Sequence, residues 1–193
     1  TWEPENDDSD PLTFAPDGFV DVPGDYNHAT FEMMRQAKTE DVMIIASIWR
    51  VPGWMVENPA DESGQIIPRD LYPEAVESIA AWLMRARDEY GVDVDYVSFN
   101  EANLGIRVLL TPFDVIELLR LAGPRFAELG LKTRWLLGDT SNMAEAADYA
   151  GWIWQAEDIR PYLGPLAFHS WDAGAADSTL ERIGKLADEN ELE

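Results

Sequence analysis

The chain has 193 residues, of which 46% are hydrophobic and 26% charged, a composition that fits one globular domain over residues 1–193. Its formal net charge of −23 excludes the cationic surface that nucleic-acid binding requires, and it disfavours polyanionic substrates. Because the chain has no cysteine, disulfides, thiol nucleophiles and zinc-thiolate sites are also excluded.

Membrane insertion is not expected from the sequence. The longest apolar run, residues 42–49, is far shorter than the roughly 18 residues that cross a bilayer, and the first ten residues contain no basic or apolar signal region. The chain begins with Thr1, and we expect it to be an excerpt of a longer protein. Its acid-rich, lysine-poor composition fits either adaptation to high salt or an ordinary acidic surface.

The first half of the chain predicts one helix and one strand between two long loops. Residues 1–26 are rich in Pro, Asp and Gly and read as a loop, and a helix is expected over residues 27–40. Residues 42–49 form a strand too apolar to have an exposed face, which is typical of a parallel sheet covered on both sides. A loop rich in proline and glycine follows over residues 50–70.

The second half alternates regularly between helices and strands. Helices are expected over residues 73–91 and from Thr111 to about Gly130. A further helix follows residue 142 and ends at about residue 157, and the last one begins at Ser178. Strands are expected over residues 95–100, 132–138 and 165–170. Thr111, Pro112 and Asp114 form an N-terminal helix signal, and the pair Gly123-Pro124 should kink or break the helix that they start.

Four strands that alternate with helices require parallel pairing through right-handed crossovers, so the fold class is α/β. An open doubly wound sheet and a (β/α)8 barrel both fit this pattern. No glycine-rich phosphate loop follows any strand, so nucleotide binding at a switch point has no support. Every expected strand ends in polar or aromatic groups, as strands do at the catalytic face of a barrel. The four strand–helix units amount to half of the eight that a complete barrel has.

The strand ends supply the candidate site residues. They are Trp49 and Arg50 after the first strand, Asn100 and Glu101 after the second, Asp139 after the third, and His169, Trp171 and Asp172 after the fourth. Because the carboxyl ends of parallel strands converge in a barrel, we expect these side chains to share one site. Glu101 is the first candidate for a reacting group.

The motifs SIWRVPGWM, VSFNEAN, LLGDTSN and FHSWD, in this order, resemble strands 3 to 6 of the clan A retaining glycoside hydrolases, most closely the family 30-like O-glycosyl hydrolases. The resemblance covers the chain from about Met33 onward and implies a partial (β/α)8 TIM barrel. It makes Glu101 the general acid/base and Asn100 a ligand of the sugar 2-hydroxyl. It also places Trp49, Arg50 and Trp54 around the sugar.

The same resemblance places His169 and Trp171 in the sugar subsite and implies an exported protein that acts on an oligo- or polysaccharide. Ala102 stands where the clan usually has proline. The clan's nucleophilic glutamate ends the seventh strand, which would lie beyond Glu193. The resemblance therefore implies a retaining β-glycoside hydrolase of which residues 1–193 are the central part, inactive in isolation.

Two alternatives stay open. Asp139 or Asp172 could supply the second carboxylate of an inverting mechanism, or the chain could be a non-catalytic carbohydrate-binding half barrel. No metal and no cofactor are expected, because the acidic run from Glu3 to Asp10 lacks the glycine and the distal glutamate of an EF-hand and reads as a solvated loop. Four further tryptophans, Trp82, Trp135, Trp152 and Trp154, are expected in the core.

Overall fold

A computed structural model describes residues 2–171 and 177–192. The strands are β1 (Ile45–Ile48), β2 (Tyr96–Phe99), β3 (Arg134–Thr140) and β4 (Leu163–Phe168). The helices are α1 (Tyr26–Lys38), α2 (Tyr72–Tyr90), α3 (Pro112–Glu128), α4 (Met143–Trp154) and α5 (Asp177–Asn190). Within the described residues the expected alternation is confirmed, with each boundary within a few residues of the prediction.

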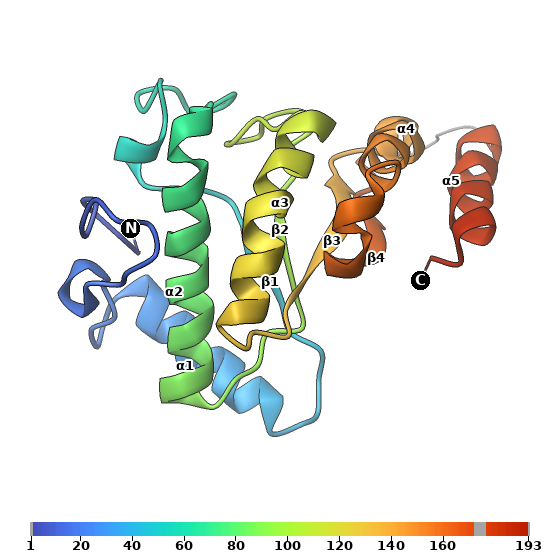
Figure 1. Cartoon of the computed structure of the whole chain (residues 1–193). Coiled ribbons are helices and arrows are strands. Elements are labelled where there is room, and N and C mark those ends of the chain that lie inside the picture. The colour runs from blue at the N-terminus through green and yellow to red at the C-terminus, as the bar shows by residue number, and fades with distance from the viewer. Residues whose placement is uncertain (1, 172–176, 193) are drawn as a thin grey trace.

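The strands form one parallel sheet in the order β1-β2-β3-β4. Figure 1 shows α2, α3, α4 and α5 following one another in chain order beside the sheet, and neighbouring helices in this series contact each other. Sequential parallel strands with a helix after each are the repeating unit of a (β/α)8 barrel. The predicted fold class, a partial barrel, is confirmed.

Local sequence signals explain where the helices begin and end. The Thr111 hydroxyl accepts a hydrogen bond from the Asp114 backbone, and the Asp114 carboxylate accepts one from the Thr111 backbone, which completes the predicted capping box of α3. Asn142 caps α4 in the same position, and Gly91 ends α2 with a φ of 68°, which a residue with a side chain rarely adopts. The caps at Thr111 and Asn142 end the loops that follow β2 and β3.

The sequence predicts a kink or a break at Pro124, and the break is wrong. Residues Pro112–Glu128 form one α-helix with Pro124 inside it. Proline removes one intrahelical hydrogen bond, but its neighbours Ala122, Gly123 and Phe126 are all buried in the core. Packing on both sides of the proline therefore keeps the helix continuous.

Three further expectations about burial are wrong. The strand over residues 42–49 is expected to have no exposed face, yet the residues of β1 alternate between exposed and half-buried, and Ile45 is 51% exposed. Trp135 is buried, as predicted for the core, but Trp152 is 53% exposed on the outer side of α4, where its ring lies 6.1 Å from that of Phe113. Glu3, which was expected in a solvated acidic loop, is only 1% exposed. The N-terminal segment folds back onto α2 and covers it, so the loop has a buried side.

Gly123 marks the closest approach of α3 to the chain that follows α4. A Cβ atom at this position would lie 2.1 Å from the ring of Tyr162. Gly184 in α5 is also helical, but a Cβ atom there would meet nothing within 4 Å. Gly123 and Gly184 thus both have a helical backbone, but only Gly123 packs closely against another side chain.

Substituting these two glycines should have opposite effects on stability. Gly123→Ala should lower the free energy of unfolding by about 1–3 kcal/mol, because the ring must move out of a packed contact. Gly184→Ala should raise it by up to about 1 kcal/mol, because alanine is the better helix former. Urea titrations of both variants measure the difference, and equal shifts for the two would contradict the packing at Tyr162.

Candidate active site

The carboxyl ends of β2, β3 and β4 lie side by side. The backbone N–H of Glu101 donates to the carbonyl oxygen of Asp139 over 3.1 Å, and the N–H of His169 donates to that of Thr140 over 2.6 Å. These bonds extend the parallel pairing beyond the ends of β2 and β4, onto the last two residues of β3. As a result, the side chains that follow three strands converge on one point.

A chain of polar contacts connects these side chains. The carboxylate of Asp139 accepts a 2.5 Å hydrogen bond from the Ser98 hydroxyl, and its other oxygen lies 3.2 Å from Nε2 of His169. The opposite ring nitrogen, Nδ1, lies 3.4 Å from Oε1 of Glu101. The indole N–H of Trp171 donates to the same Glu101 oxygen, and its ring stacks on His169 with centroids 5.8 Å apart.

His169 therefore stands between two carboxyl groups. A neutral imidazole can donate its Nε2–H to Asp139 and accept, at Nδ1, a hydrogen bond from a protonated Glu101, whereas an imidazolium donates to both carboxylates. The ring can thus pair with Glu101 as an acid or as a carboxylate. A group that must gain and lose a proton during a reaction needs such a partner.

The backbone is strained at both carboxyl residues. Glu101 has a φ of 51° and Asp139 a φ of 52°, in the left-handed region that residues other than glycine rarely occupy. Such strain costs of order 1–3 kcal/mol per residue and concentrates at functional sites. Here it turns each carboxyl group back over the end of its strand, where Glu101 is only 5% exposed.

Asn100 is buried next to Glu101 with part of its amide unused. Its Oδ1 accepts a 3.4 Å hydrogen bond from Ser47 in β1, whereas Nδ2 is buried and has no hydrogen-bond partner among the described residues. A buried amide N–H without a partner is costly, and a ligand hydroxyl would satisfy it. The position therefore suits a polar ligand at the end of β2.

The aromatic and basic candidates lie farther out. Trp171 is 75% exposed, although its N–H reaches Glu101, and Trp49 and Arg50 are exposed after β1. The indole N–H of Trp54 instead donates to the carbonyl oxygen of Glu3 over 3.3 Å, so this ring turns toward the N-terminal segment. Asp172 lies outside the described residues.

The structure thus brings Glu101, Asp139, His169 and Trp171 into one cluster with Asn100 beside it. No hydrogen bond or ion pair joins the described residues Trp49, Arg50 and Trp54 to Glu101, so their predicted sugar contacts stay predictions.

Sequence reasoning missed several polar residues that hold this cluster together. Ser98 is a buried hydroxyl in the middle of β2, and its signal was a polar residue within the apolar run YVSF. Asn103 accepts a hydrogen bond from the Ser141 backbone and donates to Glu145, which links the loop after β2 to the start of α4. No strand or helix pattern in the sequence indicates the hydrogen bonds of Asn103 with Ser141 and Glu145.

The loops after β1 and β2 are also tied together. Gly64 donates its N–H to the carbonyl oxygen of Gly105, and Gln65 forms an isolated parallel bridge with Val108. Because Gly105 has a φ of 63° and a Cβ atom there would lie 3.0 Å from Gly64, only glycine allows this approach. The two loops therefore form one continuous rim beside the cluster.

Among residues 2–171 and 177–192, no three His, Asp or Glu side chains are placed to hold a metal ion together. No helix in the same ranges is both long and apolar enough to cross a membrane.

Comparison with known proteins was informative for structure alone. No protein-family model and no curated protein matches the sequence. The endo-β1,6-glucanase BT3312 superposes with a TM-score of 0.72 over 90% of this chain and 41% of its own, at 19% identity. The fold is that of glycoside hydrolase family 30 barrels.

Two further structures agree with this assignment of the fold. The catalytic domain of the family 30 xylanase C from Talaromyces cellulolyticus gives a TM-score of 0.66 at 17% identity, over 80% of this chain and 38% of its own. The family 30 subfamily 8 xylanase Xyn30A from Clostridium acetobutylicum gives 0.65 at 14% identity, over 79% and 40%. The chain thus spans about two fifths of the length of the structures that it resembles.

The strain at Glu101 can be measured with two truncations. Glu101→Gly and Glu101→Ala both remove the carboxyl group, but only glycine adopts a φ of 51° without penalty. The glycine variant should therefore be more stable than the alanine variant by about 1–2 kcal/mol. Equilibrium unfolding in urea gives the difference, and an alanine variant of equal or greater stability would exclude the left-handed conformation.

The hydrogen bonds of Asp139 can be tested without disturbing the backbone. Asp139→Asn keeps a residue that tolerates the left-handed region but replaces one acceptor oxygen with a donor, which should cost about 1–3 kcal/mol of stability. The control is Asp148→Asn, which removes an exposed ion pair with Arg182 and should change stability by less than about 0.5 kcal/mol. Equal effects in thermal or urea unfolding would show that Asp139 does not hold Ser98 and His169.

Proposed function

We propose that this chain is the central part of a retaining β-glycoside hydrolase that acts on an oligo- or polysaccharide, with Glu101 as the general acid/base. The observation that carries the proposal is the buried Glu101 carboxyl group between His169 and Trp171 at the end of β2. The family 30 barrel fold supports it, because barrel enzymes place their reacting groups at this end of the strands. Export of the protein belongs to the same proposal.

The proposed reaction has two halves. In the first, Glu101 gives its proton to the leaving glycosidic oxygen while a second carboxylate attacks the anomeric carbon. In the second, the Glu101 carboxylate takes a proton from water, which attacks the glycosyl-enzyme intermediate and restores the second carboxylate. His169 suits the acid form of Glu101, because the Nδ1 of a neutral ring can accept a hydrogen bond from the Glu101 O–H.

The surroundings of Glu101 suit a sugar. The free Nδ2 of Asn100 can donate to a hydroxyl next to the reacting carbon, a contact worth several kcal/mol in the transition state of such enzymes. The exposed ring of Trp171 offers an apolar face for the C–H side of a sugar ring. The net charge of −23 favours a neutral substrate over a polyanionic one.

The second carboxylate, in this proposal, is a glutamate from chain outside residues 1–193. Asp139 is the nearby alternative, but both of its oxygens are engaged, one by Ser98 and the other by His169. A carboxylate with both oxygens engaged in this way is poorly placed to attack carbon or to activate water. An inverting pair of Glu101 with Asp139 or Asp172 therefore ranks second among the enzymatic mechanisms.

A non-catalytic carbohydrate-binding half barrel is the competing function. Among the described strands, β1 and β4 each have one unpaired edge, and such edges invite pairing with other strands. A second copy or the remaining strands of a barrel could fill these edges. Sugar affinity without turnover after barrel completion would favour the binding function over the hydrolase.

The acid/base role is tested with Glu101→Gln in the completed barrel. The amide has nearly the same shape but no proton to give, so kcat on a substrate with a poor leaving group should fall by about 10²–10⁴-fold. Azide should restore turnover of a substrate with a good leaving group by replacing the activated water. The control Glu117→Gln removes an exposed carboxylate on α3 and should leave both rates unchanged.

Three results decide the test. Full activity of the Glu101→Gln variant would overturn the acid/base assignment, and an equal loss in the Glu117→Gln control would attribute the effect to folding. Residues 1–193 alone should show no turnover, because one of the two carboxylates is missing from them.

A further inference from the structure

Residues 2–20 form a strap that packs against α2, as the blue segment beside this helix shows in Figure 1. The indole N–H of Trp2 donates to the carbonyl oxygen of Ser78 over 3.0 Å, and the ring stacks on Phe19 with centroids 5.0 Å apart. Val20 donates its N–H to the carbonyl oxygen of Trp2 over 2.7 Å, which closes the strap on itself. The strap is therefore attached to α2 at its first residues.

Three glutamates meet beneath this attachment. Glu3 of the strap and Glu77 of α2 are each 1% exposed, and Glu74, one helical turn earlier, is 9% exposed. Each of the three has one buried carboxyl oxygen without a hydrogen-bond partner. Several negative charges cannot occupy one dry place without a large cost, so protons must neutralise part of the cluster.

The charged groups around the cluster do not neutralise it. Asp7 of the strap adds a further negative charge, although its carboxylate accepts bonds from the backbone of Asp8 and Ala15. Arg85 of α2 pairs with Asp21 and Glu89.

On the neighbouring helix, Arg125 of α3 bonds the carbonyl oxygen of Leu12 and pairs with Glu128. Among the described residues, no ion pair reaches Glu3, Glu74 or Glu77.

Burial therefore shifts the titration of the two deepest carboxyls. Desolvation, opposed by a hydrogen bond from Ser78, raises the pKa of Glu3 to about 7. Desolvation, the hydrogen bond with Glu74 and the negative charges of the cluster raise the pKa of Glu77 to about 9. Both groups therefore hold their protons at pH values where a glutamate in water has lost its own.

We propose that Glu3 and Glu77 form a proton-dependent latch that fastens the strap to α2 and releases it as the pH rises. In the closed state the carboxyl groups of Glu3 and Glu77 are neutral, and Glu77 shares a hydrogen bond with Glu74. In the open state water reaches the cluster and the carboxylates ionise. The latch follows from the burial of these groups and does not depend on the proposed enzymatic activity.

The latch also reaches the rim of the candidate active site. The carbonyl oxygen of Glu3 accepts the indole N–H of Trp54 over 3.3 Å, and Trp54 lies in the loop that follows β1. The same loop carries Trp49 and Arg50. Release of the strap therefore removes a support of this loop.

The direction of the pH effect follows from linkage. The open strap has ordinary glutamates and the closed strap has raised pKa values, so the latch is fully effective below about pH 4.5 and is lost as the pH rises through the closed-state values. Between pH 4.5 and its own closed-state pKa, each glutamate raises the equilibrium constant for opening of the strap by about tenfold per pH unit. Above about pH 9 the effect levels off.

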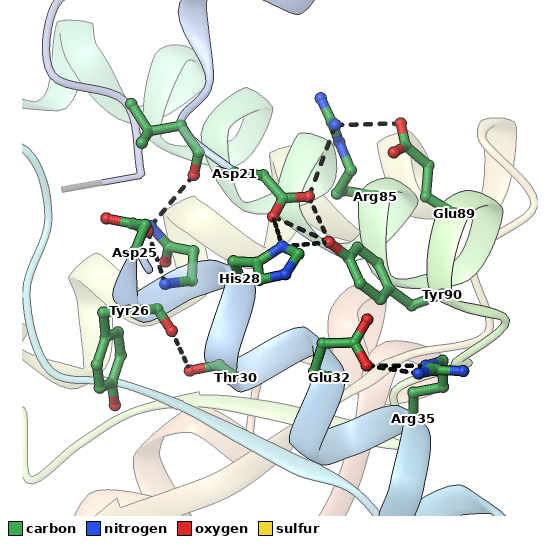
Figure 2. Close-up of polar contacts among 12 residues, drawn as sticks. Asp21, Asp25, Tyr26, His28, Thr30, Glu32, Arg35, Arg85, Glu89 and Tyr90 are labelled. Atoms are coloured by element: carbon green, nitrogen blue, oxygen red, sulfur yellow. Dashed lines mark hydrogen bonds and ion pairs between the residues drawn. The ribbon is translucent and has the colours of Figure 1, made fainter. Parts of the chain in front are cut away.

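The second attachment of the N-terminal segment provides an internal reference. Figure 2 shows Asp21 between His28, Tyr90 and Arg85, and the Tyr90 hydroxyl donates to both carboxylate oxygens over 2.8 and 2.9 Å. Here the carboxylate is paired with donors, and burial raises the pKa of Tyr90 to about 12, so this hydroxyl keeps its proton below pH 9. Rising pH should therefore release the latch and leave the hydrogen bonds between Tyr90 and Asp21 in place.

The test is amide hydrogen exchange of the whole chain at pH 6 and pH 8, expressed as protection factors to remove the intrinsic pH dependence. Protection of the Val20 N–H, which depends on Trp2, should fall by at least about tenfold in the wild type. Glu77→Gln should reduce this fall, and the double variant with Glu3→Gln should abolish it, because glutamine copies the neutral acid. The control Glu117→Gln should behave as the wild type does.

Three outcomes would overturn the latch. One is constant protection in the wild type between pH 6 and pH 8, and another is the same fall in the double variant. The third is stabilisation of the strap by added calcium chloride that disappears in Glu77→Gln, because a cation and not protons would then balance the cluster.

Discussion

Parallel pairing of β2 with β3 is the constraint on which the candidate site depends. It places Glu101 and Asp139 at adjacent strand ends, where the N–H of Glu101 bonds the carbonyl oxygen of Asp139 and both residues adopt the left-handed conformation. β4 continues the same pattern and adds His169, which lies between the two carboxyl groups. One ladder of backbone hydrogen bonds therefore aligns two carboxyl groups and the imidazole that lies between them.

The protein buries carboxyl groups in two places and stabilises them by different means. At the strand ends, hydroxyl, imidazole and indole donors surround Glu101 and Asp139, so charge can be carried there and a proton can move. Beneath the strap, Glu3 and Glu77 each have one buried carboxyl oxygen without a donor, and burial keeps both groups neutral. A chain with 37 acidic residues thus buries one pair of carboxyl groups among hydrogen-bond donors and another pair with oxygens that lack them.

Sequence patterns predicted the fold because strands and helices follow local rules. Alternating apolar segments and the Thr111-Asp114 cap gave the elements, and the polar strand ends gave Glu101, Asp139 and His169. The burial of Glu3, the exposure of Trp152 and the continuity of α3 through Pro124 depend on which distant segments pack together. No periodicity records such contacts, so these features required the structure.

The central claim is that Glu101 serves a double displacement with a second carboxylate. Proton NMR of the completed barrel cleaving a β-glycoside tests it most directly, because the first sugar released can be observed before its anomers interconvert. The account predicts that the β anomer appears first, since two inversions retain the configuration. If the α anomer appears first, a single displacement by water has occurred, and an inverting pair of carboxyl groups must replace the proposed mechanism.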